Sequence, residues 1–369
     1  MFACRIRLVW VFLVVATKVA ALSADERSLV DVYVAGSDGY HTYRIPALVA
    51  SPRGTILAFC EGRKTGRADH GDIDLMLRRS TDVGKSWEPM QVVHEEGGTR
   101  PITIGNPCPV VDRDSGTIWL TFCRDNDDVL VTSSSDDGRT WTPPREITAD
   151  VKQPEWSWYA TGPGVGIQLE RAPHKGRLVI PCDHRVMHDG RPVMHSHVFY
   201  SDDRGQSWQL GGTLEKHTDE CQVVELSSGE LLINMRNYWA RDGGRPERGG
   251  MRAIARSHDG GLSWLPLEFD PVLVEPICQA SLIAIPRRGE PVSRVLVFSN
   301  PAAKDARRNM TVRASFDEGK TWPREIVVDR GSAAYSCLAA LPGGKFGLLY
   351  EKDDYGRIVF TKIELDSRP

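Results

Sequence analysis

The feature that most constrains the fold is a short pattern, Ser-x-Asp-x-Gly-x-(Ser/Thr)-Trp, that occurs five times along the chain. Ser and Asp side chains can bond to backbone amides a residue or two further on, and Gly supplies the positive φ that such a turn needs. The closing Trp then brings a large apolar surface to the next strand. The pattern therefore predicts five structural hairpin turns, which begin 54 to 67 residues apart at Ser80, Ser134, Ser201, Ser257 and Ser315.

Short β-type runs lie between the repeats and are separated by Gly, Pro and Asp. A unit of about 55–60 residues with several short strands is typical of a propeller blade, and blades cannot bury their faces alone. The spacing predicts an all-β chain, a six-bladed β-propeller of four-stranded antiparallel blades, with one blade that lacks the repeat. We expect a single domain over residues 25–369. The runs are GTIWLTFC (116–123), GRLVIPC (176–182), ELLINM (230–235) and RVLVFS (294–299).

The N-terminus resembles an export signal. Arg5 and Arg7 precede an apolar run over residues 8–16, and small residues follow as far as Ala24. The run is shorter than the roughly 20 apolar residues that span a bilayer, although an uncleaved anchor is the alternative. We expect residues 1–24 to be removed, no stable membrane insertion, and an exported protein, whether extracellular, periplasmic or lysosomal.

Composition narrows the range of partners. A formal net charge of -3 gives no sign of a nucleic-acid surface, and we expect a monomer without a nucleic-acid partner. Seven cysteines follow the signal, an odd and scattered set that we expect to be mostly buried apolar residues. No recognised ligand spacing completes a zinc site, so neither a metal nor another cofactor is expected. The segment considered for zinc contains Cys182, His184, His188, His195 and His197.

The repeat is the Asp-box, and the chain resembles the exo-α-sialidases of the bacterial and lysosomal type from about Val30 to Glu364. The residues that carry this resemblance lie outside the repeats. They are YRIP with Arg44, EGRKTGRADHGDIDLMLRRS with Asp69, DECQVVEL with Glu220, INMRN with Arg236, RRNMTVRASFDEGKTW with Arg307, GSAAYSCLAAL with Tyr335, and LLYEKDD with Glu351.

The resemblance implies a role for each of these residues. Tyr335 would be the nucleophile, Glu220 its base and Asp69 the acid/base group, with Asp72 or Asp74 as alternatives to Asp69. A phenol suits this task because a carboxylate nucleophile would be repelled by the carboxylate that sialic acid carries on its anomeric carbon. Asp219 is the alternative to Glu220.

The same resemblance implies a carboxylate-binding clamp of Arg44, Arg236 and Arg307, with Arg308 as the alternative to Arg307. Guanidinium groups stay charged and form bidentate, charge-assisted hydrogen bonds with carboxylates. Glu351 would brace Arg44.

The function implied is a retaining exo-α-sialidase that hydrolyses terminal sialic acid from glycoproteins, glycolipids or oligosaccharides, with a sialylated glycan as partner. Alternatives are a catalytically silent glycan-binding propeller, a hydrolase of a deaminated sialic acid, and a sialic acid transferase. A loop with Trp156, Trp158 and Tyr159 would either contact the aglycone or glycerol chain, or serve as a packed anchor.

Overall fold

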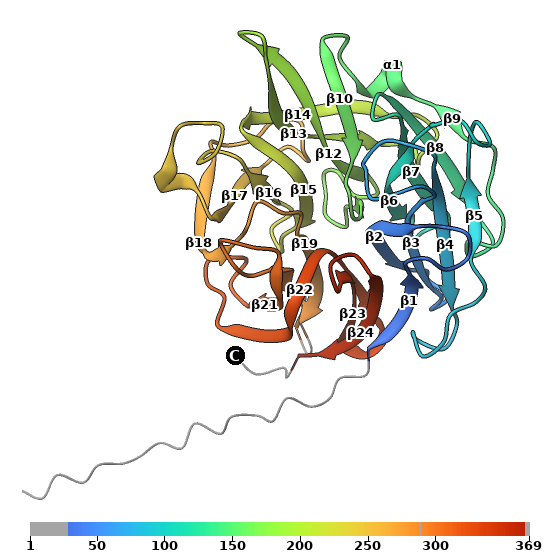
Figure 1. Ribbon diagram of the computed structural model, residues 1–369. Helices are drawn as coiled ribbons and strands as arrows, with labels where there is room; N and C mark the ends of the chain where they lie inside the picture. Colours follow the sequence, from blue (N-terminus) through green and yellow to red (C-terminus); the bar gives the residue numbers. More distant parts are fainter. Residues whose placement is uncertain (1–28, 288–289, 366–369) are drawn as a thin grey trace, which may run out of the picture.

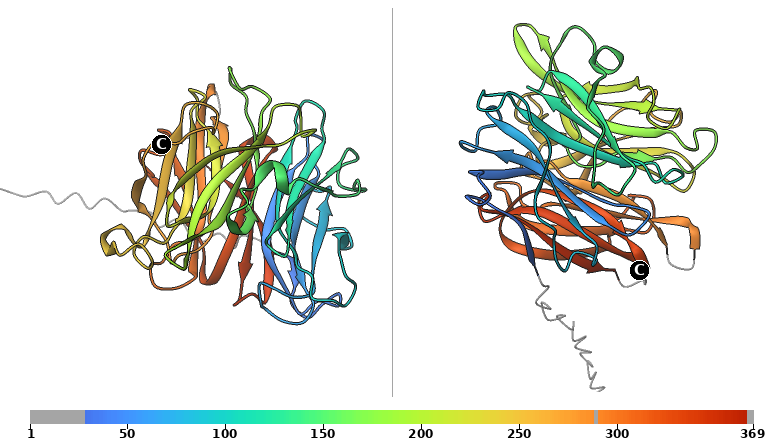
Figure 2. Two further views of the ribbon diagram at one scale, coloured as in Figure 1. Left: turned by 90° about the horizontal axis from the view of Figure 1, so that it is seen from above. Right: turned by 90° about the vertical axis from the view of Figure 1, so that its right-hand side faces the viewer.

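The computed structural model describes residues 29–287 and 290–365 of the 369-residue chain. The predicted signal, residues 1–24, lies outside the described residues. Antiparallel sheets stand around a common centre in a propeller-like ring, and β2, β6, β15, β19 and β22 lie nearest that centre (Figure 1). Figure 2 shows the same sheets from two further sides, with loops joining the strands at both ends.

Four sheets of this ring are separate blades. The first is β2 (Thr42–Ala50), β3 (Ile56–Arg63), β4 (Ile73–Ser80) and β5 (Gln91–His94). The second is β6 (Ile104–Val111), β7 (Ile118–Arg124), β8 (Asp128–Ser134) and β9 (Arg145–Glu146). The third is β10 (Trp156–Thr161), β12 (Leu178–His188), β13 (Arg191–Ser201) and β14 (Gln209–Lys216), with β11 (Ile167–Gln168) paired to β12. The fourth is β15 (Thr218–Glu225), β16 (Leu231–Asn237), β17 (Met251–Ser257) and β18 (Glu268–Val274).

The remaining strands form one seven-stranded sheet, in which the first strand of the chain pairs with the last. Helical segments are short within the described residues: α1 (Thr148–Val151) and the 3-10 turns Pro246–Arg248 and Pro342–Gly344. The seven strands are β1 (Val30–Val34), β19 (Ser281–Arg287), β20 (Glu290–Pro301), β21 (Arg308–Ser315), β22 (Arg324–Leu341), β23 (Lys345–Lys352) and β24 (Arg357–Glu364).

The prediction of six four-stranded blades is wrong. The described strands form five hydrogen-bonded sheets, of which four are separate blades, and one of those four has a fifth strand. The cause is β22, whose 18 residues pair with β21 as far as Ser332 and with β23 from Ala333 onward. The spacing of the repeats counts turns, but it does not reveal a strand that continues from one partner to the next.

The five repeat turns form as the sequence predicts, each after the strand that ends at the repeat serine. In the first turn, the Gly84 N–H donates to Ser80 Oγ at 2.8 Å and the Ser86 N–H donates to Asp82 Oδ1 at 3.0 Å. The Ser86 hydroxyl closes the turn on Asp82 Oδ2 at 2.6 Å. The other four turns repeat these three hydrogen bonds. Gly84 has φ 79°, a conformation that glycine adopts without strain.

The core lies between the sheets. Every residue of β3 and of β15 is buried, as expected for strands that are covered on both faces. One cluster packs Leu48 and Phe59 of the first blade against Phe122 of the second and Phe360 of the seven-stranded sheet. Because each buried side chain of this size contributes roughly 1.5–3 kcal/mol, these contacts hold neighbouring sheets in fixed positions around the centre.

Candidate active site

A polar cavity of about 210 Å³ opens at one end of the innermost strands. Six of the seven residues predicted for the site line it, and the seventh, Glu351, contacts Arg44 directly. The structure therefore brings together residues that are up to 291 positions apart in the sequence. They come from β2, β15, β16, β22 and two loops. The six lining residues are Arg44, Asp69, Glu220, Arg236, Arg307 and Tyr335.

Irregular strand pairing aims several of these side chains. The register of β2 against β3 shifts between Arg44 and Ala47, and that of β22 against β23 shifts between Ala333 and Ser336, around Tyr335. A similar shift in β15 lies around Glu220, between Thr218 and Cys221. Because a bulge turns a side chain away from its regular alternation, it can direct these residues into the cavity.

The predicted nucleophile and base contact each other. The Tyr335 hydroxyl donates a short hydrogen bond to Glu220 Oε1. Arg236 Nη1 donates to Glu220 Oε2 at 2.6 Å and to the Tyr335 hydroxyl at 3.1 Å. The three side chains therefore form one hydrogen-bonded group, with the base between the phenol and a guanidinium.

Burial and the neighbouring Glu220 carboxylate raise the pKa of Tyr335 well above its ordinary value of 10, whereas the guanidiniums of Arg236, Arg44 and Arg307 lower it. The phenol is therefore neutral at physiological pH. Its proton is already hydrogen-bonded to a carboxylate that could accept it.

Glu351 connects Arg44 to β22, the strand that carries Tyr335. Arg44 Nε and Nη2 donate to the two Glu351 carboxylate oxygens at 3.0 and 3.3 Å, and the backbone N–H groups of Ile45 and Tyr335 donate to the same carboxylate at 3.0 Å each. Ile45 has φ 61°, a strained value for a β-branched residue. Strain of this kind persists where surrounding contacts hold it, as Glu351 does here.

The two candidates for the third arginine differ in position. Arg307 lines the cavity, donates to the Tyr355 hydroxyl at 3.0 Å, and has its guanidinium carbon 5.4 Å from the centre of the Tyr335 ring. Arg308 is exposed and pairs with Asp305 at 2.9 Å. The geometry therefore favours Arg307 over Arg308.

Asp69 lies at the cavity rim with 65% of its side chain exposed. It pairs with Arg63 Nη1 at 2.9 Å and Arg44 Nη1 at 3.4 Å. Burial tends to raise the pKa of Asp69, but these two guanidiniums outweigh that effect and lower it. The alternatives, Asp72 and Asp74, do not line the cavity and instead pair with Lys64 at 3.0 and 3.1 Å.

Several residues of the cavity were not predicted. Arg63 stands two positions after Glu61 on β3, so both side chains point to the same face and pair at 2.7 Å. Tyr238 follows Arg236 at the same spacing, and its ring lies 5.0 Å from the Arg236 guanidinium carbon. A charged or aromatic residue at i+2 from a predicted site residue is the signal that would have found Tyr238, whereas Arg63 follows Glu61, which was not predicted either. Asp183 and Arg185 also line the cavity, at the end of a buried strand.

The segment with three aromatic residues is strand β10 and not the expected loop, and its side chains lie in two different surroundings. Trp158 lines the cavity, with the Arg185 guanidinium 4.2 Å above its ring. Trp156 is buried and stacks on His184 at 3.5 Å, and Tyr159 is fully buried, so these two are packed anchors. The packed anchor is therefore confirmed for Trp156 and Tyr159, whereas contact of Trp158 with the aglycone or glycerol chain stays a prediction.

In the segment considered for zinc, the Nδ1 atoms of His184 and His197 lie 2.9 Å apart and contact each other. No group of three or more His, Cys, Asp or Glu side chains that could hold a metal ion was found among the described residues. Seven cysteines are free and buried, as expected: Cys60, Cys108, Cys123, Cys182, Cys221, Cys278 and Cys337. Across the described part of the chain, no helix has the length and apolar character needed to cross a membrane.

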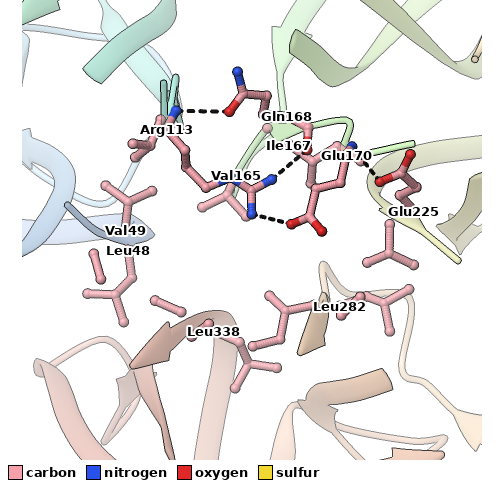
Figure 3. Close-up of a pocket in the computed structure, with 18 of the residues that line it drawn as sticks. Leu48, Val49, Arg113, Val165, Ile167, Gln168, Glu170, Glu225, Leu282 and Leu338 are labelled. Atoms are coloured by element: carbon pink, nitrogen blue, oxygen red, sulfur yellow. Dashed lines mark hydrogen bonds and ion pairs between the residues drawn. The ribbon is translucent and has the colours of Figure 1, made fainter. Parts of the chain in front are cut away.

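A second cavity, of about 320 Å³, lies at the other end of the same innermost strands (Figure 3). Its walls are mostly apolar, with Leu48, Val165 and Leu282 among them. Its charged residues contact protein groups, because Arg113 pairs with Glu170 at 2.5 Å and donates to the Gln168 backbone oxygen at 2.7 Å. Although it is the larger cavity, it contains none of the predicted site residues.

The fold and the site define an all-β, propeller-like protein with an arginine-rich cavity suited to an anionic ligand. A family model described as a BNR repeat-like domain matches residues 54–348. A sialidase of Micromonospora viridifaciens is 38% identical over 87% of this chain and 51% of its own length, and a sialidase of Bacteroides fragilis is 32% identical over 92% and 65%. The solved structure of the Hadza microbial sialidase Hz136 is similar, with a TM-score of 0.82 and 32% identity over 92% of this chain and 69% of that one. The chain belongs to the sialidase family. It spans about half the length of the Micromonospora viridifaciens relative and about two thirds of the length of the Bacteroides fragilis relative.

Proposed function

We propose that this protein is a retaining exo-α-sialidase that releases terminal sialic acid from glycans, with Tyr335 as nucleophile. The observation that carries the proposal is the hydrogen bond from Tyr335 to Glu220 within a cavity lined by Arg44, Arg236 and Arg307. Family membership supports the reaction class, and the positions of the individual side chains support their roles.

The three guanidiniums would bind the substrate carboxylate. Arg44 is held in place by Glu351 and Arg236 by Glu220, so two of the three groups are oriented before the ligand arrives. Charge-assisted hydrogen bonds to a carboxylate are the strongest kind available to such groups. The carboxylate on the anomeric carbon would therefore fix that carbon next to the Tyr335 hydroxyl.

In the first step the Tyr335 oxygen attacks the anomeric carbon, its proton passes to Glu220, and the bond to the aglycone oxygen breaks. Asp69 protonates that leaving oxygen. A carboxylate nucleophile would face repulsion from the substrate carboxylate, whereas a neutral phenol does not, and sialidases are a known exception to the two-carboxylate rule for this reason.

In the second step water attacks the anomeric carbon, Asp69 removes the proton from water, and the bond to Tyr335 breaks as Glu220 returns the proton to the phenol. Two displacements give net retention of configuration. Arg44 and Arg63 lower the pKa of Asp69, which favours the ionised form that this second step requires. When the substrate carboxylate binds Arg44, it would weaken the hold of Arg44 on Asp69 and make protonation easier for the first step.

The test is release of fluorophore from an α-linked sialoside by the purified protein, with Tyr335→Phe measured in parallel. We expect activity in the wild type and a loss of at least about 10³-fold in the variant, because the attacking oxygen is absent. Proton NMR of the first sugar released should show the α anomer. A folded wild type that is inert on several sialosides would refute the proposal, and activity on a deaminated sialoside alone would replace it with that related hydrolase.

The proposal extends to the whole chain. Residues 25–369 would act as one catalytic domain, as a monomer, after export and removal of residues 1–24. Mass spectrometry of the secreted product tests this: a mature protein that still contains residues 1–24 would contradict it.

A further inference from the structure

Two carboxyl groups without a role in the proposed reaction lie beside its base. Asp183 on β12 and Asp219 on β15 both line the cavity, with exposures of only 1% and 3%. The two carboxyl groups lie close enough for each to shift the pKa of the other. Because an ionised carboxylate can only accept hydrogen bonds, a hydrogen bond between them requires that one of the two carries a proton.

The neighbouring backbone fixes this contact. Cys221 Sγ donates to the Cys182 backbone oxygen at 3.3 Å, and the Ser196 hydroxyl donates to the Asp219 backbone oxygen at 2.5 Å. The first bond joins the two strands that carry the aspartates, and the second joins β15 to Ser196 of β13, which pairs with Asp183 in the sheet. The backbones that carry the two carboxyl groups therefore cannot move apart without breaking cross-strand hydrogen bonds.

The surroundings show which aspartate carries the charge. Asp219 Oδ2 lies 3.8 Å from Arg236 Nε, a buried N–H that has no hydrogen-bond acceptor among the described residues. Asp183 Oδ1 is also buried and accepts no hydrogen bond from the described part of the chain. Burying a charge without a donor is costly, so the negative charge belongs on Asp219 and the proton on Asp183. Burial and the charge of Asp219 raise the pKa of Asp183 well above its usual range, in agreement with this assignment.

We propose that Asp183 and Asp219 share one proton, and that this pair is a positioning element that holds Arg236, and through Arg236 the base Glu220. The inference rests on the proposed function for its catalytic consequence. Neither aspartate is a catalytic residue in this scheme. Asp219 instead gives Arg236 a second anionic neighbour on the side away from Tyr335.

The shared proton sets the charge of this corner of the cavity. When the proton is present, the negative charges of Asp219 and Glu220 face the positive charges of Arg236 and Arg185. When the proton is lost, Asp183 would add a third negative charge, and Arg236 would be drawn toward the two aspartates. We therefore expect activity to fall at alkaline pH as the pair loses its proton. The charged and titratable groups that face the pair are Glu220, Arg185, Arg236, Tyr159, Tyr238, Cys123 and Cys221.

Infrared spectroscopy of the full chain tests for the proton independently of any activity. Protein labelled with ¹³C-carboxyl aspartate should show a protonated-carboxyl band at pH 7 that moves with the label, which separates aspartate from glutamate. The band should be lost in Asp183→Asn and kept in Asp317→Asn, because hydrogen bonds from Thr321 and Ser315 outweigh burial and lower the pKa of Asp317. Wild type without such a band from pH 6 to pH 8 would overturn the proposal, even if the variants fail to fold.

Matched amide substitutions test the positioning role. Asparagine resembles a protonated aspartate in shape and hydrogen bonding, so Asp183→Asn imitates the proposed state and Asp219→Asn removes its charge. We expect the loss of kcat/KM in Asp219→Asn to exceed that in Asp183→Asn by at least about tenfold, and the alkaline fall in activity to move to higher pH in Asp183→Asn. Equal losses, or a larger loss in Asp183→Asn, would overturn the assignment. If the band is present but the wild type is inert on every sialoside, the shared proton stands and the proposed function fails.

Discussion

Lowering the pH from 7.5 to 5.0 is expected to destabilise the fold through two histidines that are buried in the neutral form. His184 and His197 have exposures of 1% and 0%, and their Nδ1 atoms lie 2.9 Å apart. Trp156 stacks on His184 with 3.5 Å between ring centres. A hydrogen bond between two ring nitrogens needs one N–H and one bare nitrogen, so protonation of both rings would break it.

The size of the effect follows from the difference in proton binding between the folded and unfolded chains. Burial lowers the pKa of His197 to about 3 and lowers that of His184 further, whereas an unfolded histidine titrates near about 6.5. Between these values the unfolded chain binds protons that the folded chain does not, so stability falls as pH falls through about 6.5. At pH 5.0 each ring costs about 2 kcal/mol, and the two together cost about 4 kcal/mol. That is a large part of the 5–15 kcal/mol that stabilises a typical domain.

The assay is urea unfolding followed by tryptophan fluorescence at pH 7.5, 6.5, 5.5 and 5.0. Burial raises the pKa of the Asp183, Asp219 and Glu275 carboxyl groups, and these groups act in the opposite direction, because the folded chain holds protons there that the unfolded chain has lost. The histidine contribution is therefore the difference in pH dependence between the wild type and a variant without the two rings. The double variant His184→Gln/His197→Gln should be less stable at pH 7.5, because it loses the ring stacking. Between pH 7.5 and 5.0 it should lose about 4 kcal/mol less stability than the wild type does. The exposed His258→Gln should keep the wild-type dependence. A change in the free energy of unfolding between pH 7.5 and 5.0 that is the same in the double variant and in the wild type would refute the reasoning.

Three further substitutions test the site and the core. Arg307→Ala should raise KM for a sialoside at least about tenfold because its guanidinium lines the cavity, whereas Arg308→Ala should change it less than about twofold; equal effects in steady-state kinetics would contradict the choice of Arg307. Glu351→Gln should lower kcat/KM about 10²-fold, because the buried carboxylate that orients Arg44 loses its charge, and full activity would show that this bracing is dispensable. Trp208→Ala should lower the free energy of unfolding by about 3–5 kcal/mol in urea denaturation, since its side chain is 2% exposed, and a loss below about 1 kcal/mol would contradict its place in the core.

The sequence predicted the parts of the fold that depend on local chemistry. The turn at Asp82 follows from side chains two to four residues apart, so the repeat alone was sufficient to place it. The number of separate sheets was not predictable in this way. It depends on β22, which changes partner from β21 to β23 between Ser332 and Ala333, although Gly331 directly before this point would favour an end to the strand.

The site was predictable where a segment resembles a motif of a known family. Tyr335 and Glu220 were identified through that resemblance, and their side chains do meet. Asp183 was not identified, because a single Asp after a buried strand is also an ordinary turn residue. Its proposed role arises from its nearness to Asp219 on another blade, and the bulge around Asp219 leaves no signal in residue type.

The three guanidiniums proposed to bind the substrate carboxylate are not balanced equally by carboxylates of the protein. Arg44 is paired with Glu351, and Arg236 with Glu220, whereas Arg307 has no ion pair within the described residues and only a tyrosine hydroxyl as hydrogen-bond acceptor. Burying a cation in this way is costly, and an incoming carboxylate would relieve that cost. At Arg44 and Arg236 the same carboxylate must compete with an existing partner. The largest gain on binding an anion is therefore expected at Arg307, which makes this residue the main source of affinity, while Arg44 and Arg236, already oriented, determine where the anion sits relative to Tyr335.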